Sequence, residues 1–314
     1  MKEKFEFPPE LNKKFLKAKK LEWITIGYLI TAALLMMLTM GNSQTMKTAW
    51  FEDVLSLTPS ISFLIASKFY LKPRNRDFPF GYHRVVSIAY LCSALSLFTV
   101  GAYLFADSAM KLIKAEHPSI GTVVLFGKQV WLGYIMMAAL VYGSIPPIFL
   151  GIKKLPLARE LHEKNLYTDA QMNKADWMTG AAGIIGIAGI GLGWWWSDAA
   201  AAIIISFDII HDGSRNLKQA VFDLMNQIPK TADNKKDDPL LKEIKNLLDK
   251  EEWIKESKIR VREEGHIYFG EAFVIPKNER DLLPKIESTV NKISELNWLI
   301  YEFNIIPVRS LEKR

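Results

Sequence analysis

Two segments place oxygen-bearing side chains at helical spacing inside otherwise apolar stretches. The segment TDAQMNKADWMTG carries Asp169, Asn173 and Asp176 at intervals of four and three residues, so the three share one face of a helix. The segment AWFEDVLS carries Glu52 and Asp53 near the start of another apolar stretch. A carboxylate inside a membrane-spanning helix costs about 2.5–3.5 kcal/mol on insertion scales, which makes such residues candidates for function. The chemistry open to them is the binding of a cation.

Apolar stretches long enough to cross a bilayer, at about 20 residues each, occur six times. They cover approximately residues 21–40, 49–71, 85–113, 130–152, 175–195 and 197–210, and the last continues helically beyond its apolar part. We therefore predict an α-helical membrane protein with six transmembrane helices. Much of the net charge of +6 lies in segments that flank these stretches, such as KKFLKAKK and KPRNR.

The distribution of basic residues predicts the orientation of the chain. Cytoplasmic loops are enriched in Lys and Arg, and the loops assigned to that side include Lys153, Lys154, Arg159 and Lys164. Both termini are accordingly expected in the cytoplasm. Because the positive charge flanks apolar spans, it indicates a bilayer and no nucleic-acid partner.

Several functional classes are disfavoured by the composition. The single cysteine, Cys92, excludes a disulfide framework and a multi-cysteine zinc site. Residues 1–20 are polar, so no cleavable signal peptide is expected and this segment is predicted to be cytoplasmic. No paired catalytic motif, phosphate-binding loop or nucleophile constellation is found. We therefore expect no enzymatic activity and no cofactor.

The C-terminal part of the chain reads as a small soluble module. An amphipathic helix begins near Leu240, the segments KIRVRE and HIYFGEAFVIP alternate like strands, a second helix follows, and LIYEFNIIP forms a third strand. This αββαβ order predicts an α+β domain with helices on one face of a sheet. The predicted division is a membrane domain at 21–229, a linker at 230–238 and a cytoplasmic domain at 239–314.

An ordered set of motifs resembles the cation diffusion facilitator family. The set comprises the loop FPFGYHR before the third span, two aspartates seven residues apart on the fifth, WWSDAAAA at the start of the sixth, and the αββαβ tail. The resemblance implies a homodimeric divalent-cation transporter that exchanges metal ions for protons. It also implies a ferredoxin-like dimerisation domain in the cytoplasm. We expect the cytoplasmic membrane of a prokaryote as its location and efflux out of the cytoplasm as its direction.

The same resemblance locates the expected transport site. Family members carry DxxxD on the second span and HxxxD or DxxxD on the fifth, and of the four matching positions here only Asp176 is unchanged. Polar residues stand directly beside two of the others. The predicted metal site, neighbours included, is Glu52, Asp53, Ser56, Met172, Asn173 and Asp176.

This donor set favours hard cations. It is rich in oxygen and has no His or Cys, which suits Mn²⁺, Mg²⁺ or Fe²⁺ better than Zn²⁺. Met172 is a soft ligand, and its alternative interpretation is an apolar contact that has replaced a ligand. The changes at Ser56 and Met172 leave a second hypothesis open, a transport-deficient membrane scaffold or binding subunit.

Further polar residues are candidates for a proton or accessory site. In the segment FDIIHDG, Asp208 and His211 share a helical face, although His211 is also expected near the cytoplasmic interface. Asp169 is expected on the cytoplasmic side, lining the entry path of the ion. His162, in a charged loop, is expected to be solvated. The tail has only His266 among nearby acids, which argues against a regulatory metal site there.

Overall fold

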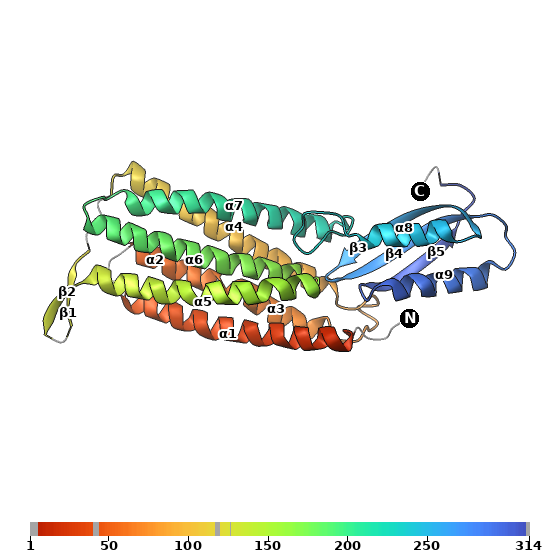
Figure 1. Cartoon of the computed structure of the whole chain (residues 1–314), viewed down its shortest axis with the longest axis horizontal. Coiled ribbons are helices and arrows are strands. Elements are labelled where there is room, and N and C mark those ends of the chain that lie inside the picture. The colour runs from red at the N-terminus through yellow and green to blue at the C-terminus, as the bar shows by residue number, and fades with distance from the viewer. Residues whose placement is uncertain (1–5, 40–43, 117–119, 126, 312–314) are drawn as a thin grey trace.

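A helical bundle and a smaller α+β domain lie end to end (Figure 1). The computed structural model describes residues 6–39, 44–116, 120–125 and 127–311. The helices of the bundle are α1 (Pro9–Thr39), α2 (Gln44–Leu55), α3 (Leu57–Phe69), α4 (Arg84–Ile113), α5 (Leu132–Glu160), α6 (Lys164–Gly191) and α7 (Ser197–Leu224). A hairpin of β1 (Thr122–Leu125) and β2 (Lys128–Trp131), which was not predicted, lies at the far end of the bundle from the α+β domain.

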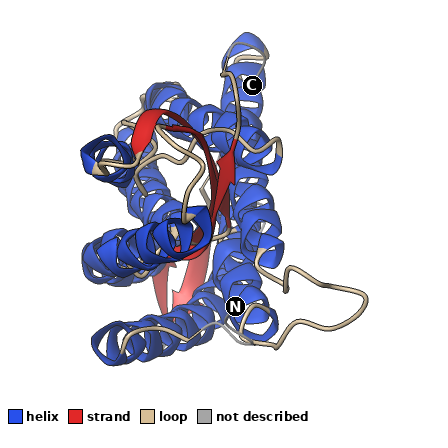
Figure 2. Ribbon diagram, turned by 90° about the vertical axis from the view of Figure 1, so that its right-hand side faces the viewer, coloured by secondary structure: helices blue, strands red, loops and turns tan. Residues whose placement is uncertain are grey.

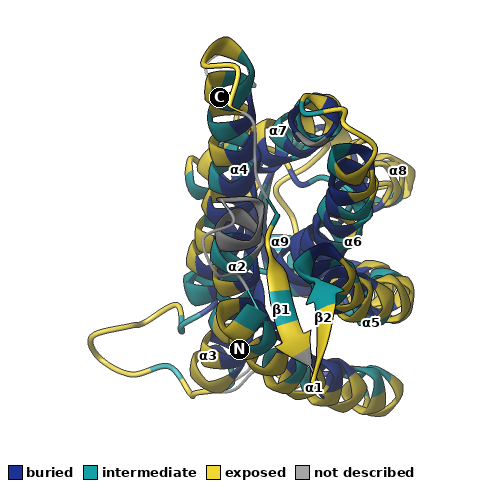
Figure 3. Ribbon diagram, turned by 90° about the vertical axis from the view of Figure 1, so that its left-hand side faces the viewer, coloured by how far each residue is buried: buried dark blue, intermediate teal, exposed yellow. Residues whose placement is uncertain are grey.

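Exposed residues lie along the outer faces of the bundle (Figure 3), and many of them are large and apolar. Within the described residues, α1, α4 and α5 are long and apolar enough to cross a membrane. The pair α2–α3 and the 28-residue helices α6 and α7 pack beside them but carry more polar residues or are shorter. Large apolar side chains face outward on many of these helices, including Trp23, Leu38, Ile65, Ile88, Phe149, Ile152, Ile185, Ile204 and Phe207.

The predicted second span is not one continuous helix, because it is interrupted at Ser56 between α2 and α3. Pro59 has no N–H, so it cannot donate to the carbonyl of Leu55, four residues earlier. Ser96 of α4 satisfies that carbonyl instead, with an Oγ–O distance of 2.9 Å. The break is therefore built into the sequence, and it falls at a predicted site residue.

Glycines allow close contact between neighbouring helices. A Cβ on Gly180 of α6 would lie 2.1 Å from the Ser144 hydroxyl of α5, and one on Gly213 of α7 would lie 2.7 Å from the Phe98 backbone of α4. Small residues of this kind let helix backbones approach in a bilayer, where packing and not hydrophobicity drives association. Helix α6 is thereby held firmly against α5, which fixes the face that carries Asp176.

The C-terminal domain has a three-stranded sheet covered by two helices (Figure 2). Its elements follow in the predicted order: α8 (Leu240–Lys250), β3 (Ile254–Glu264), β4 (Ile267–Pro276), α9 (Leu282–Leu296) and β5 (Ile300–Pro307). Strand β3 pairs antiparallel with β4, and β4 pairs parallel with β5 after the crossover through α9. Apolar side chains of both helices and all three strands form its core.

The turn between β3 and β4 inserts into the end of the bundle. Gly265 has φ +74°, and a Cβ there would lie 2.6 Å from the His83 carbonyl oxygen, so only glycine fits both the backbone and the contact. The next residue, His266, is fully buried and stacks on Phe7 with ring centroids 5.2 Å apart. One apolar cluster, which includes Phe7 and Phe269, thus spans the bundle and the sheet.

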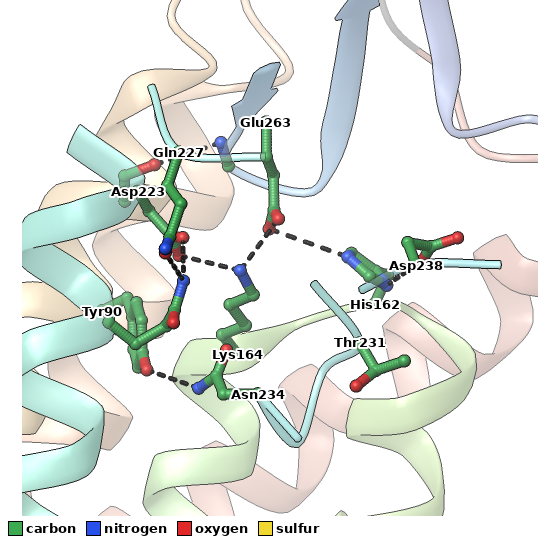
Figure 4. A network of polar contacts seen from close by, with 12 residues as sticks. Tyr90, His162, Lys164, Asp223, Gln227, Thr231, Asn234, Asp238 and Glu263 are labelled. Atoms are coloured by element: carbon green, nitrogen blue, oxygen red, sulfur yellow. Dashed lines mark hydrogen bonds and ion pairs between the residues drawn. The ribbon is translucent and has the colours of Figure 1, made fainter. Parts of the chain in front are cut away.

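A polar network accompanies this junction (Figure 4). The ammonium of Lys164, at the start of α6, lies 2.8 Å from Asp223 of α7 and 2.8 Å from Glu263 of β3. His162 bonds the hydroxyl of Tyr268 at 3.0 Å and is buried, so the prediction that it is solvated is wrong. The predicted linker is also partly packed, since Asn234 donates to Tyr90 at 2.8 Å.

Candidate functional site

The break between α2 and α3 lies against α6 at its buried aspartate. The Ser56 hydroxyl donates to Asp176 Oδ1 over 2.6 Å, and the exposed fractions of the two residues are 1% and 9%. The backbone N–H of Ser56 donates to the carbonyl of Glu52, four residues earlier, at 2.8 Å. Two residues 120 positions apart, both predicted from the sequence to be in one site, are therefore in direct contact.

Two further carboxylates belong to the same buried region. Glu52 and Asp53 are 5% and 8% exposed, and the charge of Asp176 acts on both of them. Glu52 Oε1 and Asp53 Oδ2 have no hydrogen-bond partner in the described part of the protein. Buried polar atoms are normally satisfied, so these oxygens are positions at which a proton, a cation or a water would bind. No three His, Cys, Asp or Glu side chains among the described residues already converge in a metal-binding geometry.

Met172 lies in an apolar environment. It is 1% exposed and belongs to a cluster with Leu97 and Val100 of α4 and Ile209 of α7. A thioether is polarizable and fills irregular gaps between such side chains. This packing supports the apolar interpretation of Met172 over a role as a metal ligand.

Asn173 lies between the two aspartates of α6 and bonds within its own helix. Its Nδ2 donates to the Asp169 carbonyl at 2.8 Å, and its Cβ lies 3.5 Å from the position a Cβ on Gly151 would take. The residue is 2% exposed. The side-chain atom with which Asn173 could bind a cation is therefore its amide oxygen.

Asp169, which we predicted on the cytoplasmic side lining the entry path of the ion, is buried on α6, which begins at Lys164, well before the predicted apolar span. Its carboxylate pairs with the Lys154 ammonium, which also lies 3.1 Å from Glu22 Oε2. The side-chain exposures of Glu22, Lys154 and Asp169 are 0%, 0% and 1%. Lys154 is thus a buried ion-pair partner and not a basic residue of a cytoplasmic loop. Sequence reasoning missed Glu22, although a glutamate inside the first apolar stretch was the available signal.

The comparison with protein families decides the identity of this bundle. Residues 23–225 match the family described as the cation efflux transmembrane domain. The chain belongs to the cation efflux family. A comparison with curated proteins finds no match. The matched segment runs from α1 to the end of α7 and so includes every residue of the Ser56–Asp176 region.

Membership of the cation efflux family agrees with the apolar helices and identifies an integral membrane protein of a transporter family. Proteins of this family carry cations and are not enzymes in general. A cation is therefore the transported substrate.

Of the candidate accessory residues on α7, Asp208 pairs with a lysine of α6. Asp208 Oδ2 lies 2.6 Å from Lys174 Nζ, and both side chains are nearly half exposed. His211 is exposed. Lys174 also lines a cavity of about 590 Å³ between α5, α6 and α7. Among the described side chains, Asp208 and His211 form no hydrogen bond or ion pair with the group around Asp176.

The junction with the C-terminal domain contains strongly perturbed ionisable groups. Burial, reinforced by the neighbouring charge of Glu263, raises the pKa of Glu163 to about 8. Burial lowers the pKa of His83 to about 4 and holds the pKa of His266 well below its usual range. Glu163 Oε2 lies 3.8 Å from His266 Nδ1. At neutral pH this junction therefore favours a protonated carboxyl group and neutral imidazoles.

Proposed function

We propose that this protein is a proton-coupled divalent-cation exporter of the cytoplasmic membrane. The observation that carries the proposal is the buried Ser56–Asp176 contact, with the carboxylates of Glu52 and Asp53 in the same region. Three carboxylates in a low-dielectric interior need positive compensation. A divalent cation can provide it in one state and protons in another, because a carboxylate loses metal affinity once it is protonated.

The donors favour hard ions. Carboxylate, hydroxyl and amide oxygens from Glu52, Asp53, Ser56, Asn173 and Asp176 suit Mn²⁺, Mg²⁺ or Fe²⁺. Met172, which packs in an apolar cluster, stands where the family commonly carries a histidine. The lack of that histidine ligand disfavours Zn²⁺.

The architecture proposed with this function has six membrane spans, counting α2–α3 as one, and both termini in the cytoplasm. The αββαβ tail is proposed to be a ferredoxin-like domain through which two copies form a homodimer. Support comes from the family match, from the element order and from the apolar outer faces of the bundle.

The test is ion flux in proteoliposomes with an imposed pH gradient. Mn²⁺, Mg²⁺, Fe²⁺ and Zn²⁺ are supplied separately, and both cation and proton movement are recorded. We expect flux of a hard ion, its loss in Asp176→Asn, and normal flux in Asp249→Asn, which makes the same change at an exposed ion pair of α8.

Two results would overturn this function. Full flux in Asp176→Asn would exclude the proposed site. Absence of flux for every ion, with a folded dimer in the same sample, would favour the transport-deficient scaffold.

A further inference from the structure

The cavity of about 590 Å³ between α5, α6 and α7 has one apolar wall that continues onto the outside of the bundle. Pro147, Ile148, Ile152 and Leu155 of α5 form this wall. Ile148 and Ile152 are 37% and 65% exposed, so the same surface also faces the bilayer. The cavity lies in the half of the bundle next to the C-terminal domain, because α5 ends and α6 begins at that end.

The opposite side of the cavity carries an excess of positive charge. Lys174 of α6, Arg215 of α7 and Lys235 of the segment after α7 all line it. Lys174 Nζ lies 2.6 Å from Asp208 and 3.8 Å from Asp212. Arg215 lies 3.3 Å from Asp212. Three cations and two carboxylates leave the group with a formal charge of +1.

The guanidinium of Arg215 has a donor that the protein does not use. Its Nη2 pairs with Asp212, whereas its Nε is buried and has no hydrogen-bond partner among the described residues. An unsatisfied buried N–H is costly. A guanidinium binds phosphate oxygens with parallel N–H groups, so a phosphate beside Arg215 would supply the missing acceptor.

Aromatic residues accompany these charges on α6. Tyr167, Lys174 and Trp177 share one face of the helix and all line the cavity. Tyr and Trp are enriched at the level of lipid headgroups, where Lys and Arg also meet the bilayer surface. The charges of Arg159 and Asp233 act on Tyr167 as well, and these two cancel each other in the sum. The cavity thus combines headgroup-level side chains with an apolar wall for acyl chains.

We infer that this cavity is a binding site for an anionic phospholipid from the leaflet next to the C-terminal domain. The phosphodiester, with a charge of −1, balances the +1 of the group around Arg215, and the acyl chains follow the α5 wall. A zwitterionic lipid has no net charge to offer. Basic pockets between membrane helices recognise anionic headgroups in this way. None of the cationic residues is a proposed ligand of the transported ion, so the inference does not depend on transport.

The test is native mass spectrometry of the delipidated full-length protein in detergent, which gives a Kd for each added lipid. Phosphatidylglycerol and phosphatidylcholine with identical acyl chains are compared, together with sn-glycerol 3-phosphate as a headgroup without chains. We expect phosphatidylglycerol to bind at least about fivefold more tightly than phosphatidylcholine, as one charge contact at the membrane surface provides. Glycerol 3-phosphate should show no binding at the same concentration.

The variants assign the binding to this cavity. Arg215→Gln should weaken phosphatidylglycerol binding at least about tenfold, because it removes a charge-assisted phosphate contact, and should leave phosphatidylcholine binding unchanged. Lys235 is exposed, so Lys235→Gln covers the case in which Arg215→Gln does not fold, with an expected loss of about fivefold. The matched control is Lys68→Gln, which removes one exposed charge at the end of α3, outside the cavity, and should bind both lipids as wild type does.

Three results would overturn the site. Equal affinity of the wild type for the two lipids would exclude recognition of charge. Wild-type affinity for phosphatidylglycerol in folded Arg215→Gln or Lys235→Gln would place the lipid elsewhere. Glycerol 3-phosphate that binds as tightly as phosphatidylglycerol would show a site for free phosphate compounds, in which the apolar wall has no part.

Discussion

Ser56→Ala isolates the contact on which the proposed transport site depends. The substitution removes one oxygen and leaves Asp176 Oδ1 without its 2.6 Å donor, in a region where both residues are at most 9% exposed. A hydrogen bond to a charged group contributes about 1.5–3 kcal/mol. For a chain of this size, each kcal/mol of lost stability lowers the unfolding midpoint by about 2 °C. The midpoint of metal-free Ser56→Ala should therefore be about 3–6 °C below that of the metal-free wild type.

The matched control is Ser206→Ala. Ser206 is also fully buried, but its hydroxyl donates to the carbonyl of Ile203 in its own helix at 2.6 Å. An ordinary bond of that kind is worth about 0.5–1.5 kcal/mol, so the expected decrease is about 1–3 °C. Differential scanning fluorimetry on both variants in detergent gives the comparison.

Addition of Mn²⁺ gives the functional half of the same experiment. We expect the Mn²⁺-induced rise of the midpoint to shrink in Ser56→Ala and to be unchanged in Ser206→Ala, because only Ser56 is beside the cation ligands. If the two metal-free variants lose the same stability and respond equally to Mn²⁺, the reasoning about Ser56 and Asp176 is refuted.

Two other substitutions test the junction and the apolar packing of α6. The pKa of Glu163 is raised to about 8 in the folded protein, so between pH 4.5 and 8 the folded protein keeps a proton that the unfolded chain releases. This residue therefore stabilises the folded state at low pH, and the contribution is lost as the pH rises toward 8. In thermal melts, Glu163→Gln should therefore gain stability relative to wild type as the pH increases from 5 to 8.5. The control Glu160→Gln, at an exposed position, should show no such gain. A stability difference between Glu163→Gln and wild type that does not change with pH would exclude Glu163 as the cause. Met172→His puts an imidazole into the apolar cluster, so we expect a loss of about 1–3 kcal/mol and no gain of Zn²⁺ flux. Restored Zn²⁺ flux in Met172→His would instead show that this side chain reaches the cation.

The sequence was sufficient to predict contacts that depend on helical spacing and on the family pattern. Glu52, Ser56 and Asp176 were predicted as one site, and the structure brings Ser56 and Asp176 into hydrogen-bond contact and buries Glu52 nearby. The reason is that position along a helix determines which face a residue occupies, and the family pattern relates the two helices.

The hydropathy pattern did not predict which polar residues are buried as ion pairs. Lys153 and Lys154 are adjacent and look alike in the sequence, yet Lys153 is exposed and Lys154 is completely buried. The partners of Lys154 are 15 and 132 positions away, so no local pattern reveals them. For the same reason the predicted apolar span begins later than α6: the first turn of the helix contains Lys164, which reads as a loop residue but pairs with Asp223 and Glu263.

The charged groups of α6 are the physical basis on which we propose a hard-ion site together with proton exchange. At the level of Asp176 the three carboxylates would carry a formal charge of −3 if all were ionised. Glu22, Asp169 and Lys154, at a second level about two helical turns away along α6, would together carry −1. Neither level can stay ionised in a low-dielectric interior without added positive charge. A protonated histidine at position 172 could have supplied part of that positive charge, but the chain has Met172 there, packed against α4 and α7. Under the proposed function these carboxylates accept either protons or a divalent cation, and Lys154 is the only ammonium paired to any of them among the described residues. We therefore expect the exchange of protons for the ion to depend on both levels, and Asp176 and Lys154 to be coupled in any measurement of transport.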